Sequence, residues 1–552
     1  MKKPTLRRTL AATLAAALLG FSSFKVLDDG DDFELIKNLE IFHTLVKNLR
    51  ILYVDETSSG DLIKTAMDKM LENLDPYTVY YPESLVEDVM FMNSGDYAGT
   101  GIDIEMMGGK AVIAQIIEGS PAQKNGLYIG DVITTADNRT LAGKSNDEID
   151  LMLKGEPGSV VKFQIERQGE KITKEIRREI IKQKSIPYYG IINGTTGYIN
   201  LSGFTENCSA EFKDALSKLK NEKKITNLII DLRYNPGGLL IEAVNIVNLF
   251  VDKGKDIVAM RGRVQEWNKT FRAENNPVDT QIPIVVLVNG KSASAAEIVS
   301  GALQDLDRAV VIGEKTFGKG LVQTTKDLVY NAKCKITTAK YYIPSGRCIQ
   351  KVDYSHKNSQ GRAESIPDSL IRTFKTANGR PVKDAGGIMP DITVATDTLS
   401  YLVENLIDKN IIFDYATKYR IKNAAIAEPE KFSVSQAEID ELKKSAGANL
   451  TNYNTITDQE IAILEKTAAN DFSSPEISRE IGDLKEVIKQ IKNSEINKYD
   501  SQIKKALEYE IIRRYYYEQG EIRYTLQNDP YITAANQVLK DAILYKKTLN
   551  KK

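Results

Sequence analysis

Between about residues 187 and 394, short apolar runs alternate with amphipathic segments, and this alternation is the strongest constraint on the fold. The runs TGYINLS, NLIIDLR, PIVVLVN and AVVIGE predict buried strands, and AEFKDALSKLK, IEAVNIVNLF and SAAEIVSGALQD predict the helices between them. Strands that alternate with helices are typical of an α/β domain with a largely parallel sheet. We therefore expect an α/β core in this part of the chain.

The segment from Tyr97 to about Ile180 has a different pattern, with short strands and glycine turns. YAGTGIDIEM and KAVIAQII predict strands, and a helix is expected around Asn146–Leu153. VVKFQIERQGEKITKEI predicts a hairpin around Gly169. Strand pairs with one helix between them predict a small barrel in addition to the α/β core.

Helices are expected at both ends of the chain. Apolar residues recur at spacings of three and four in the N-terminal region, which predicts amphipathic helix between about residues 33 and 74. Beyond about Asp397 the chain is rich in helix-forming residues, Lys, Glu and Tyr, and we find no catalytic pattern in that sequence. A helical packing or oligomerisation region is expected there.

The N-terminus has the composition of an export signal. Four basic residues precede an apolar run from Thr9 to Phe24, as in the n-region and h-region of a signal peptide. The run is shorter than the roughly 20 apolar residues that span a bilayer, and no clear A-x-A cleavage site follows it. A cleaved signal peptide and a retained membrane anchor both remain open, and both predict export. In a bacterium, export would place the protein in the periplasm or cell envelope.

Charge and cysteine content argue against several classes of protein. The formal net charge is -1, so no basic surplus indicates a nucleic-acid partner. The three cysteines, Cys208, Cys334 and Cys348, lack the spacing of metal ligands. A disulfide between Cys334 and Cys348 is one alternative, but we expect free thiols. No metal and no cofactor are expected.

The sequence has only two histidines, and neither is placed for catalysis. His43 falls in the N-terminal helical region and His356 in a polar loop. A Ser-His-Asp mechanism requires a positioned imidazole, and the sequence contains neither a G-x-S-x-G nor an H-E-x-x-H pattern. A hydrolase with this sequence is therefore expected to use another base.

A serine lies where an apolar strand ends and a helix begins, in the sequence VNGKSASAAE. Ser294 would meet the unpaired N–H groups and the positive dipole end of that helix, which favour negative charge on or near its oxygen. The same N–H groups can bind the oxyanion of a tetrahedral intermediate. Ser294-x-x-Glu297 is also a capping-box pattern, so a purely structural role is the alternative, and Ser292 is a second candidate for the cap.

A lysine stands between two glycines after the next strand, in GEKTFGKG. Burial against backbone would make the neutral amine of Lys319 available as a base, whereas the ordinary alternative is a solvated turn lysine. Gly313 to Lys319 also matches G-x-x-x-x-G-K, most of a phosphate-binding loop. Gly320 replaces the hydroxyl residue of such a loop, and LVQTT predicts a strand instead of a helix, so nucleotide binding is the weaker hypothesis.

A third strand ends in DLRYNPGGL. The paired glycines allow the backbone to turn its N–H groups toward a ligand, although a plain strand-to-helix turn is the alternative.

Together, NGKSASAAEI, GEKTFGKGLVQ and DLRYNPGG resemble the C-terminal processing peptidases, also called tail-specific proteases. In one departure, Lys291 stands where family members often have glycine.

This resemblance implies a crotonase-like α/β protease core with a Ser-Lys dyad. It implies that Ser294 is the nucleophile, that Lys319 is the general base and that Gln323 helps to hold the lysine. The implied oxyanion hole uses the backbone N–H groups of Ala295 and of Gly237 or Gly238.

The upstream segment resembles a PDZ domain through GTGI, SPA, GL and GDVI, which occur in this order. The resemblance implies a loop whose N–H groups bind a C-terminal carboxylate, with the peptide added as a strand. A small barrel used only for packing is the alternative. The implied peptide-binding residues are Gly99, Thr100, Gly101 and Ile102.

The resulting hypothesis is a serine endopeptidase that cleaves exported or envelope proteins near their C-termini, with the PDZ-like domain delivering the tail. A non-catalytic peptide-binding scaffold on a crotonase-like fold is the main alternative. The expected partners are protein substrates with accessible C-termini, and membrane anchoring and a homo-oligomer remain open. The expected segments are 1–25 as signal peptide or anchor, 26–95 as N-terminal helical region, 96–180 as PDZ-like domain, 181–400 as Ser/Lys protease core and 401–552 as helical extension.

Overall fold

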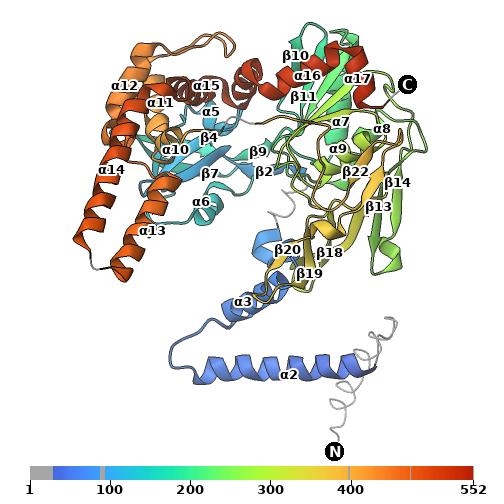
Figure 1. Ribbon diagram of the computed structural model, residues 1–552. Coiled ribbons are helices and arrows are strands. Elements are labelled where there is room, and N and C mark those ends of the chain that lie inside the picture. Colours follow the sequence, from blue (N-terminus) through green and yellow to red (C-terminus); the bar gives the residue numbers. More distant parts are fainter. Residues whose placement is uncertain (1–28, 87–93, 396–397, 473, 551–552) are drawn as a thin grey trace, which may run out of the picture. The chain divides into compact units, whose positions relative to one another are not determined.

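The computed structural model describes residues 29–86, 94–395, 398–472 and 474–550 (Figure 1). Internal contacts divide the chain into two units, which are Met1–Tyr81 with Thr325–Ile336, and Pro82–Thr324 with Thr337–Lys552. The signal peptide or anchor expected at residues 1–25 lies outside the described residues. Among the described helices, none is both long and apolar enough to cross a membrane.

The α/β core in the second unit contains a six-stranded sheet in the order β10-β11-β12-β15-β16-β23. Neighbours from β11 to β23 are parallel, and the edge strand β10 is antiparallel to β11. Parallel strands place their carboxyl ends at one edge of a sheet, so the loops after β12, β15 and β16 meet at that edge. The strands are β10 (Tyr188–Asn193), β11 (Thr196–Asn200), β12 (Asn227–Asp231), β15 (Ile284–Val288), β16 (Val310–Gly313) and β23 (Ile392–Thr393).

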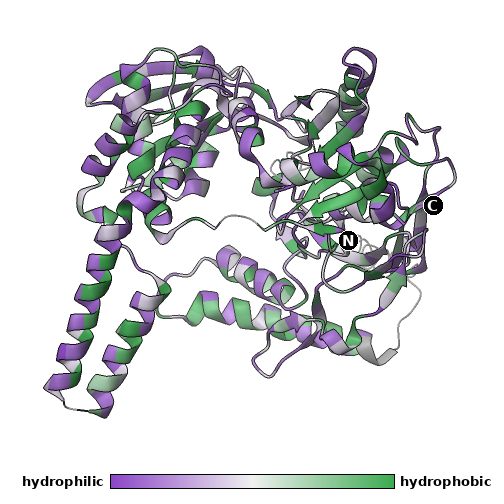
Figure 2. Cartoon of the chain, turned by 45° about the horizontal axis from the view of Figure 1, so that its top comes forward, coloured by the Kyte–Doolittle hydropathy of each residue, from purple (hydrophilic) through white to green (hydrophobic). Residues whose placement is uncertain are grey.

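Helices cover both faces of this sheet, whose strands are mostly hydrophobic (Figure 2). Alternate side chains of β15 point to opposite faces, so Val286 belongs to one apolar cluster and Val285 to the other. Helices α7, α8 and α9 contribute to the first cluster, and α16 and α17 contribute to the second. The end of the C-terminal extension therefore supplies one layer of the α/β core. The helices are α7 (Cys208–Asn221), α8 (Leu240–Asn248), α9 (Ala295–Asp305), α16 (Pro530–Lys540) and α17 (Ala542–Thr548).

The segment with glycine turns forms an antiparallel sheet in the order β3-β4-β5-β7-β8, around a separate apolar cluster. The hairpin predicted around Gly169 is confirmed as β7 and β8, and the predicted helix is α6 (Asn146–Leu153). Strand β2 (Asp96–Gly99) pairs with β9 (Glu179–Lys182). The other elements are β3 (Ile102–Met107), β4 (Lys110–Ile116), α5 (Pro121–Lys124), β5 (Val132–Ala136), β6 (Arg139–Thr140), β7 (Val160–Arg167) and β8 (Glu170–Arg177).

The predicted helical extension is confirmed, and α10, α11, α12 and α15 share an apolar cluster. Helix α15 is interrupted at Tyr517, whose φ of 51° and ψ of -152° are not helical. The helices of this region are α10 (Tyr401–Asp408), α11 (Ile411–Lys422), α12 (Gln436–Ala446), α13 (Ile456–Asp471), α14 (Pro475–Glu495) and α15 (Asp500–Thr525).

The first unit contains the predicted N-terminal helices, which are α2 (Asp29–Leu52) and α3 (Ser59–Glu72). The apolar stripe of α2 is exposed, with Leu35 and Leu39 each 58% exposed. In the first unit, β1 (Val79–Tyr81) pairs with the first residues of β18 (Lys333–Tyr342). In the second unit, the last residues of β18 pair with β13 (Asp256–Gly262), which pairs with β14 (Lys269–Arg272). Strand β17 (Leu321–Asp327) also pairs with β18. The second unit also contains two short hairpins, which are β19 (Val352–Lys357) with β20 (Ala363–Ser365), and β21 (Thr373–Lys375) with β22 (Pro381–Lys383).

A buried ion pair in the α/β core gives a test of the fold. Arg347 is 1% exposed and donates to Asp305 and Gln304, each at 2.8 Å. Arg347→Met should lower the free energy of unfolding by about 3–5 kcal/mol, because the Asp305 carboxylate stays buried without its cation. Urea unfolding followed by circular dichroism measures the change.

The matched control is Arg272→Met. Arg272 pairs with Asp256, but their side chains are 61% and 56% exposed. Such a surface pair contributes less than about 1 kcal/mol. An equal loss of stability in the two variants would contradict the structural role of Arg347.

Candidate active site

Two serines follow β15, and their surroundings differ. Ser292 is fully buried; its hydroxyl donates to the Leu232 carbonyl at 2.8 Å and accepts the Asn289 N–H at 2.9 Å. Ser294 is half-buried and directly precedes α9, with a φ of 56° and a ψ of -115°. Such backbone angles are strained for a residue with a side chain, and strain of this kind clusters at functional sites.

Lys319 lies in the loop between β16 and β17, and its side chain is half-buried between two buried glycines. The residues that follow form strand β17, as predicted. A phosphate-binding loop leads into a helix, so this geometry argues against the nucleotide-binding alternative.

The buried carboxylate of Glu297 joins the serine loop to the lysine loop. Its Oε2 accepts the main-chain N–H of Ser294 at 2.8 Å and that of Lys319 at 2.9 Å. Its Oε1 accepts the Gly318 N–H at 2.8 Å and the Thr316 hydroxyl at 2.5 Å. One oxygen atom therefore holds the main chains of both predicted catalytic residues.

Burial raises the pKa of the Glu297 carboxyl to about 7, and hydrogen bonds from Thr316, Lys319, Gly318 and Ser294 act in the opposite direction. The ionised carboxylate only accepts hydrogen bonds, so it matches all four donors. A proton on either oxygen would displace one of these donors. The charge state of Glu297 therefore controls how firmly the two loops are joined.

Tyr341 fixes the opposite polar groups of the same two residues. Its hydroxyl lies 3.1 Å from the Ser294 carbonyl oxygen and 2.6 Å from that of Lys319. Its own N–H donates to the Gly320 carbonyl at 2.9 Å. Strand β18 thereby holds both loops from a second direction.

The glycine pair after β12 lies against the serine loop. At Gly237, where φ is 101°, an added Cβ would lie 2.7 Å from the Cβ of Ser294 and 2.9 Å from the nitrogen of Ala295. The Gly237 N–H donates to the side chain of Asn235 at 2.8 Å, and the Asn235 carbonyl accepts the Ala293 N–H at 2.9 Å. Asn235 therefore joins the glycine loop to the serine loop.

The remaining predicted residues have simpler surroundings. Gln323 lies on β17, and its side-chain amide donates to the Thr337 hydroxyl at 3.2 Å. Lys291 is exposed, with its Nζ 5.6 Å from the ring centroid of Tyr234. Both histidines are exposed, and His356 bonds to Asp353 at 2.8 Å. The three cysteines are free thiols, as expected.

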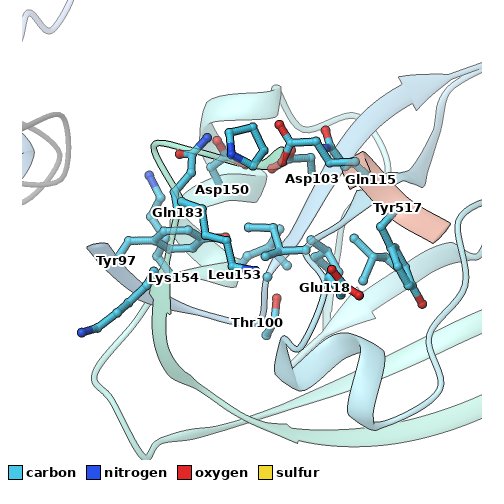
Figure 3. Close-up of a pocket in the computed structure, with 18 of the residues that line it drawn as sticks. Tyr97, Thr100, Asp103, Gln115, Glu118, Asp150, Leu153, Lys154, Gln183 and Tyr517 are labelled. Carbon is cyan, nitrogen blue, oxygen red and sulfur yellow. The ribbon is translucent and has the colours of Figure 1, made fainter. Parts of the chain in front are cut away.

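Three of the four predicted peptide-binding residues, Thr100, Gly101 and Ile102, line a cavity of about 340 Å³, whereas Gly99 is not part of its lining (Figure 3). Thr100 is 1% exposed, and its hydroxyl has no hydrogen-bond partner among the described residues. At Gly101, where φ is 77°, an added Cβ would lie 2.3 Å from the Cβ of Ser120. A buried hydroxyl without a partner, beside a turn that excludes a side chain, is suited to a polar ligand group.

Two walls of this cavity were not predicted from the sequence. Tyr517, Glu518 and Gln519 reach it from the interruption in α15, and Lys182 to Lys184 reach it from the segment after β9. The only local signal is Gly520, where an added Cβ would lie 2.2 Å from the Cβ of Tyr516. Helix periodicity gives no sign of the break.

Comparisons with known proteins identify the family. Family models match as peptidase family S41 at residues 195–355, as a PDZ domain at 98–177, and as the C-terminal helical domain of a probable PDZ-protease at 402–539. A carboxy-terminal-processing protease of Bartonella bacilliformis is 37% identical over 322 residues, which are 57% of this chain and 73% of that protein. A probable CtpA-like serine protease of Staphylococcus aureus is 33% identical over 392 residues, which are 70% of this chain and 76% of that protein.

The chain belongs to the carboxy-terminal-processing proteases of peptidase family S41. It is a serine-type peptidase with a PDZ domain, as the sequence resemblance predicted. Among solved structures, the photosystem II D1 C-terminal processing protease shares 26% sequence identity over 65% of this chain and 93% of that chain, with a TM-score of 0.37.

The raised pKa of Glu297 predicts a pH-dependent stability. Burial disfavours the charged form, so the stability that the neutral carboxyl contributes is complete below its ordinary value of 4.5 and is lost as the pH rises through about 7. Relative to Glu297→Gln, which cannot ionise, the wild-type protein should lose about 3 kcal/mol of unfolding free energy between about pH 4 and pH 8. Urea unfolding of both proteins at these two pH values measures the difference.

Glu297→Gln should also lower peptidase activity at pH 8 by about tenfold or more, because the amide NH2 of glutamine cannot accept hydrogen bonds from the loop N–H groups. Glu438→Gln is the matched control, because Glu438 accepts the Ser435 N–H in a capping box of α12 outside the two loops. Equal activities of the two variants would contradict the role given to Glu297.

Proposed function

We propose that this peptidase cleaves exported or envelope proteins near their C-termini with a Ser-Lys dyad on a crotonase-like core. Ser294 is the nucleophile and Lys319 the general base, and Gln323 orients the lysine. The observation that carries the proposal is that Glu297 and Tyr341 each contact both Ser294 and Lys319. A peptide-binding scaffold has no need for such a connection.

The proposed reaction proceeds through an acyl-enzyme. Lys319 accepts the proton as Ser294 Oγ attacks the substrate carbonyl, and then returns it to the leaving amine as the peptide bond breaks. Water, deprotonated by the same lysine, hydrolyses the ester and restores Ser294.

The proposed oxyanion hole consists of two main-chain N–H groups. Ala295 is the first residue of α9, so its N–H has no acceptor within the helix. The Gly237 N–H is already bonded to Asn235, so the second donor that we propose is Gly238. Both groups belong to loops that buried side chains hold in place, which is the preorganisation that oxyanion stabilisation requires.

Removal of either dyad residue tests this mechanism. Ser294→Ala and Lys319→Ala should each lower cleavage of an unstructured protein by about a thousandfold or more, with an unchanged circular dichroism spectrum. Mass spectrometry of the digests measures cleavage and locates the cut sites.

Ser292→Ala is the control two residues away. It removes a buried structural hydroxyl, so it should lower stability by about 1–3 kcal/mol and still cleave the substrate. Cleavage by Ser294→Ala at the wild-type rate would overturn the dyad assignment. Peptide binding without cleavage by the wild type would favour the scaffold alternative.

We further propose that the PDZ domain binds the C-terminal tail of the substrate. The free hydroxyl of Thr100 and the N–H groups of the Gly99–Ile102 loop are suited to a terminal carboxylate, and an extended peptide can pair with β3. Delivery of a tail is consistent with the name of the Bartonella relative, which describes processing at the carboxy terminus.

Thr100→Val tests the tail site, because it keeps the shape of the side chain and removes its hydroxyl. The KM for a peptide with a free C-terminus should rise about fivefold while kcat stays unchanged, which corresponds to the loss of one hydrogen bond. An amidated peptide is the control, and Thr100→Val should leave its KM unchanged. Equal effects on both peptides would contradict a contact between Thr100 and the carboxylate.

A further inference from the structure

The N-terminal end of α16 lies against two loops of the active site, although it is more than 200 residues away from them in sequence. We propose that Asp529 and Tyr531 are positioning residues, which hold the loop of the oxyanion glycines and the loop of Lys319. This inference rests on the proposed function, since it assigns these two loops to the oxyanion hole and the base.

Arg233 connects the first loop to α16. This residue follows β12 and begins the segment that leads to Gly237 and Gly238. Its guanidinium bonds to Asp231 on its own strand at 2.6 Å and to Asp529 at 2.7 Å. The same group lies 4.7 Å from the ring centroid of Tyr531. The start of the glycine loop is therefore held by its own strand on one side and by α16 on the other.

Tyr531 reaches the second loop directly. Its hydroxyl donates to Glu314 at 3.0 Å, and its ring atom Cε1 would lie 3.0 Å from a Cβ added at Gly313. Gly313 and Glu314 begin the segment that leads to Lys319. Burial, together with the adjacent Glu314 carboxylate, raises the pKa of Tyr531, so its hydroxyl keeps its proton and remains a donor.

The ion pair between Asp529 and Arg233 is not needed to attach α16 to the sheet. Ile532, Ala535, Val538 and Leu539 already pack in the apolar cluster on that face. A buried ion pair adds little net stability, because removing charges from water offsets most of their attraction. Asp529 is 8% exposed and its partner Arg233 is largely buried, so the pair mainly fixes geometry. The atoms that it fixes lie at the catalytic edge.

The neighbouring helix α17 provides a contrast within the same layer. Tyr545 bonds through its hydroxyl to the main chain of Ile284, the first residue of β15, which lies at the opposite edge of the parallel sheet. Asp541 caps α17 through the N–H groups of Ile543 and Leu544. The two helices thus use the same residue types, but the described contacts of Asp541 and Tyr545 include neither catalytic loop.

The test compares these matched pairs. Asp529→Asn keeps a helix cap, since Asn and Asp cap equally well, but it removes the charge that faces Arg233. Tyr531→Phe keeps the ring and removes the hydroxyl that faces Glu314. Each variant should lower kcat about tenfold, or about 1.4 kcal/mol, and leave the KM for a short peptide within twofold. Asp541→Asn and Tyr545→Phe should change neither constant, even where thermal stability falls.

Amide hydrogen exchange gives a readout that does not depend on turnover. Exchange in segments 233–239 and 313–320 should become faster in Asp529→Asn and Tyr531→Phe, and should stay at the wild-type rate in the two controls. If the wild type cleaves no peptide, the proposed function fails and exchange still decides the inference. If the wild type cleaves but the variants match their controls in kcat and exchange, α16 only packs against the core and the inference is overturned.

Discussion

The proposed active site depends on one buried carboxylate, that of Glu297. A parallel sheet brings the loops after β15 and β16 to the same edge, but it does not set the distance between individual main-chain atoms of the two loops. Glu297 sets it by accepting the N–H groups of Ser294 and Lys319 at a single oxygen. The carboxylate in turn tolerates burial because four donors surround it. These donors fix the loop geometry and offset part of the cost of burying the charge, although burial still raises the pKa of the Glu297 carboxyl to about 7.

The same principle explains why polar side chains collect at one edge of an otherwise apolar sheet. Strands such as β15 satisfy their main-chain groups in the ladder, and their side chains are aliphatic because both faces of the sheet are buried. The loops beyond them have N–H and C=O groups that no neighbouring strand can satisfy. Buried Asn235, Glu297 and Tyr341 supply the missing partners, and each contacts main-chain groups of more than one segment. The polar residues that satisfy the loops also determine their positions.

Sequence patterns predicted what is local in this structure. Apolar runs located the strands, and the end of a strand followed by a helix located Ser294, because each signal spans only a few residues. Glu297 was visible only as half of a capping box, since its bonds to Gly318 and Lys319 join residues more than 20 positions apart. Composition likewise predicted helix in the C-terminal region, but not that α16 covers one face of the sheet. The break at Tyr517 was missed because the surrounding residues include Glu, Gln and Arg, which favour helix, and Gly520 alone does not locate an interruption.

A lysine that acts as a general base, as proposed for Lys319, places a particular demand on the backbone that bears it. The lysine side chain has a flexible four-carbon stem, and fixing it costs about 2 kcal/mol of rotamer entropy. Conformational freedom of the main chain would add to this cost. The structure removes that freedom for Gly318, Lys319 and Gly320. Their three N–H groups donate to Glu297 twice and to Gln350 once, and their carbonyls accept from Lys351 and, twice, from Tyr341. Every main-chain polar group of these three residues is therefore engaged, which fixes the backbone from which the Lys319 side chain extends.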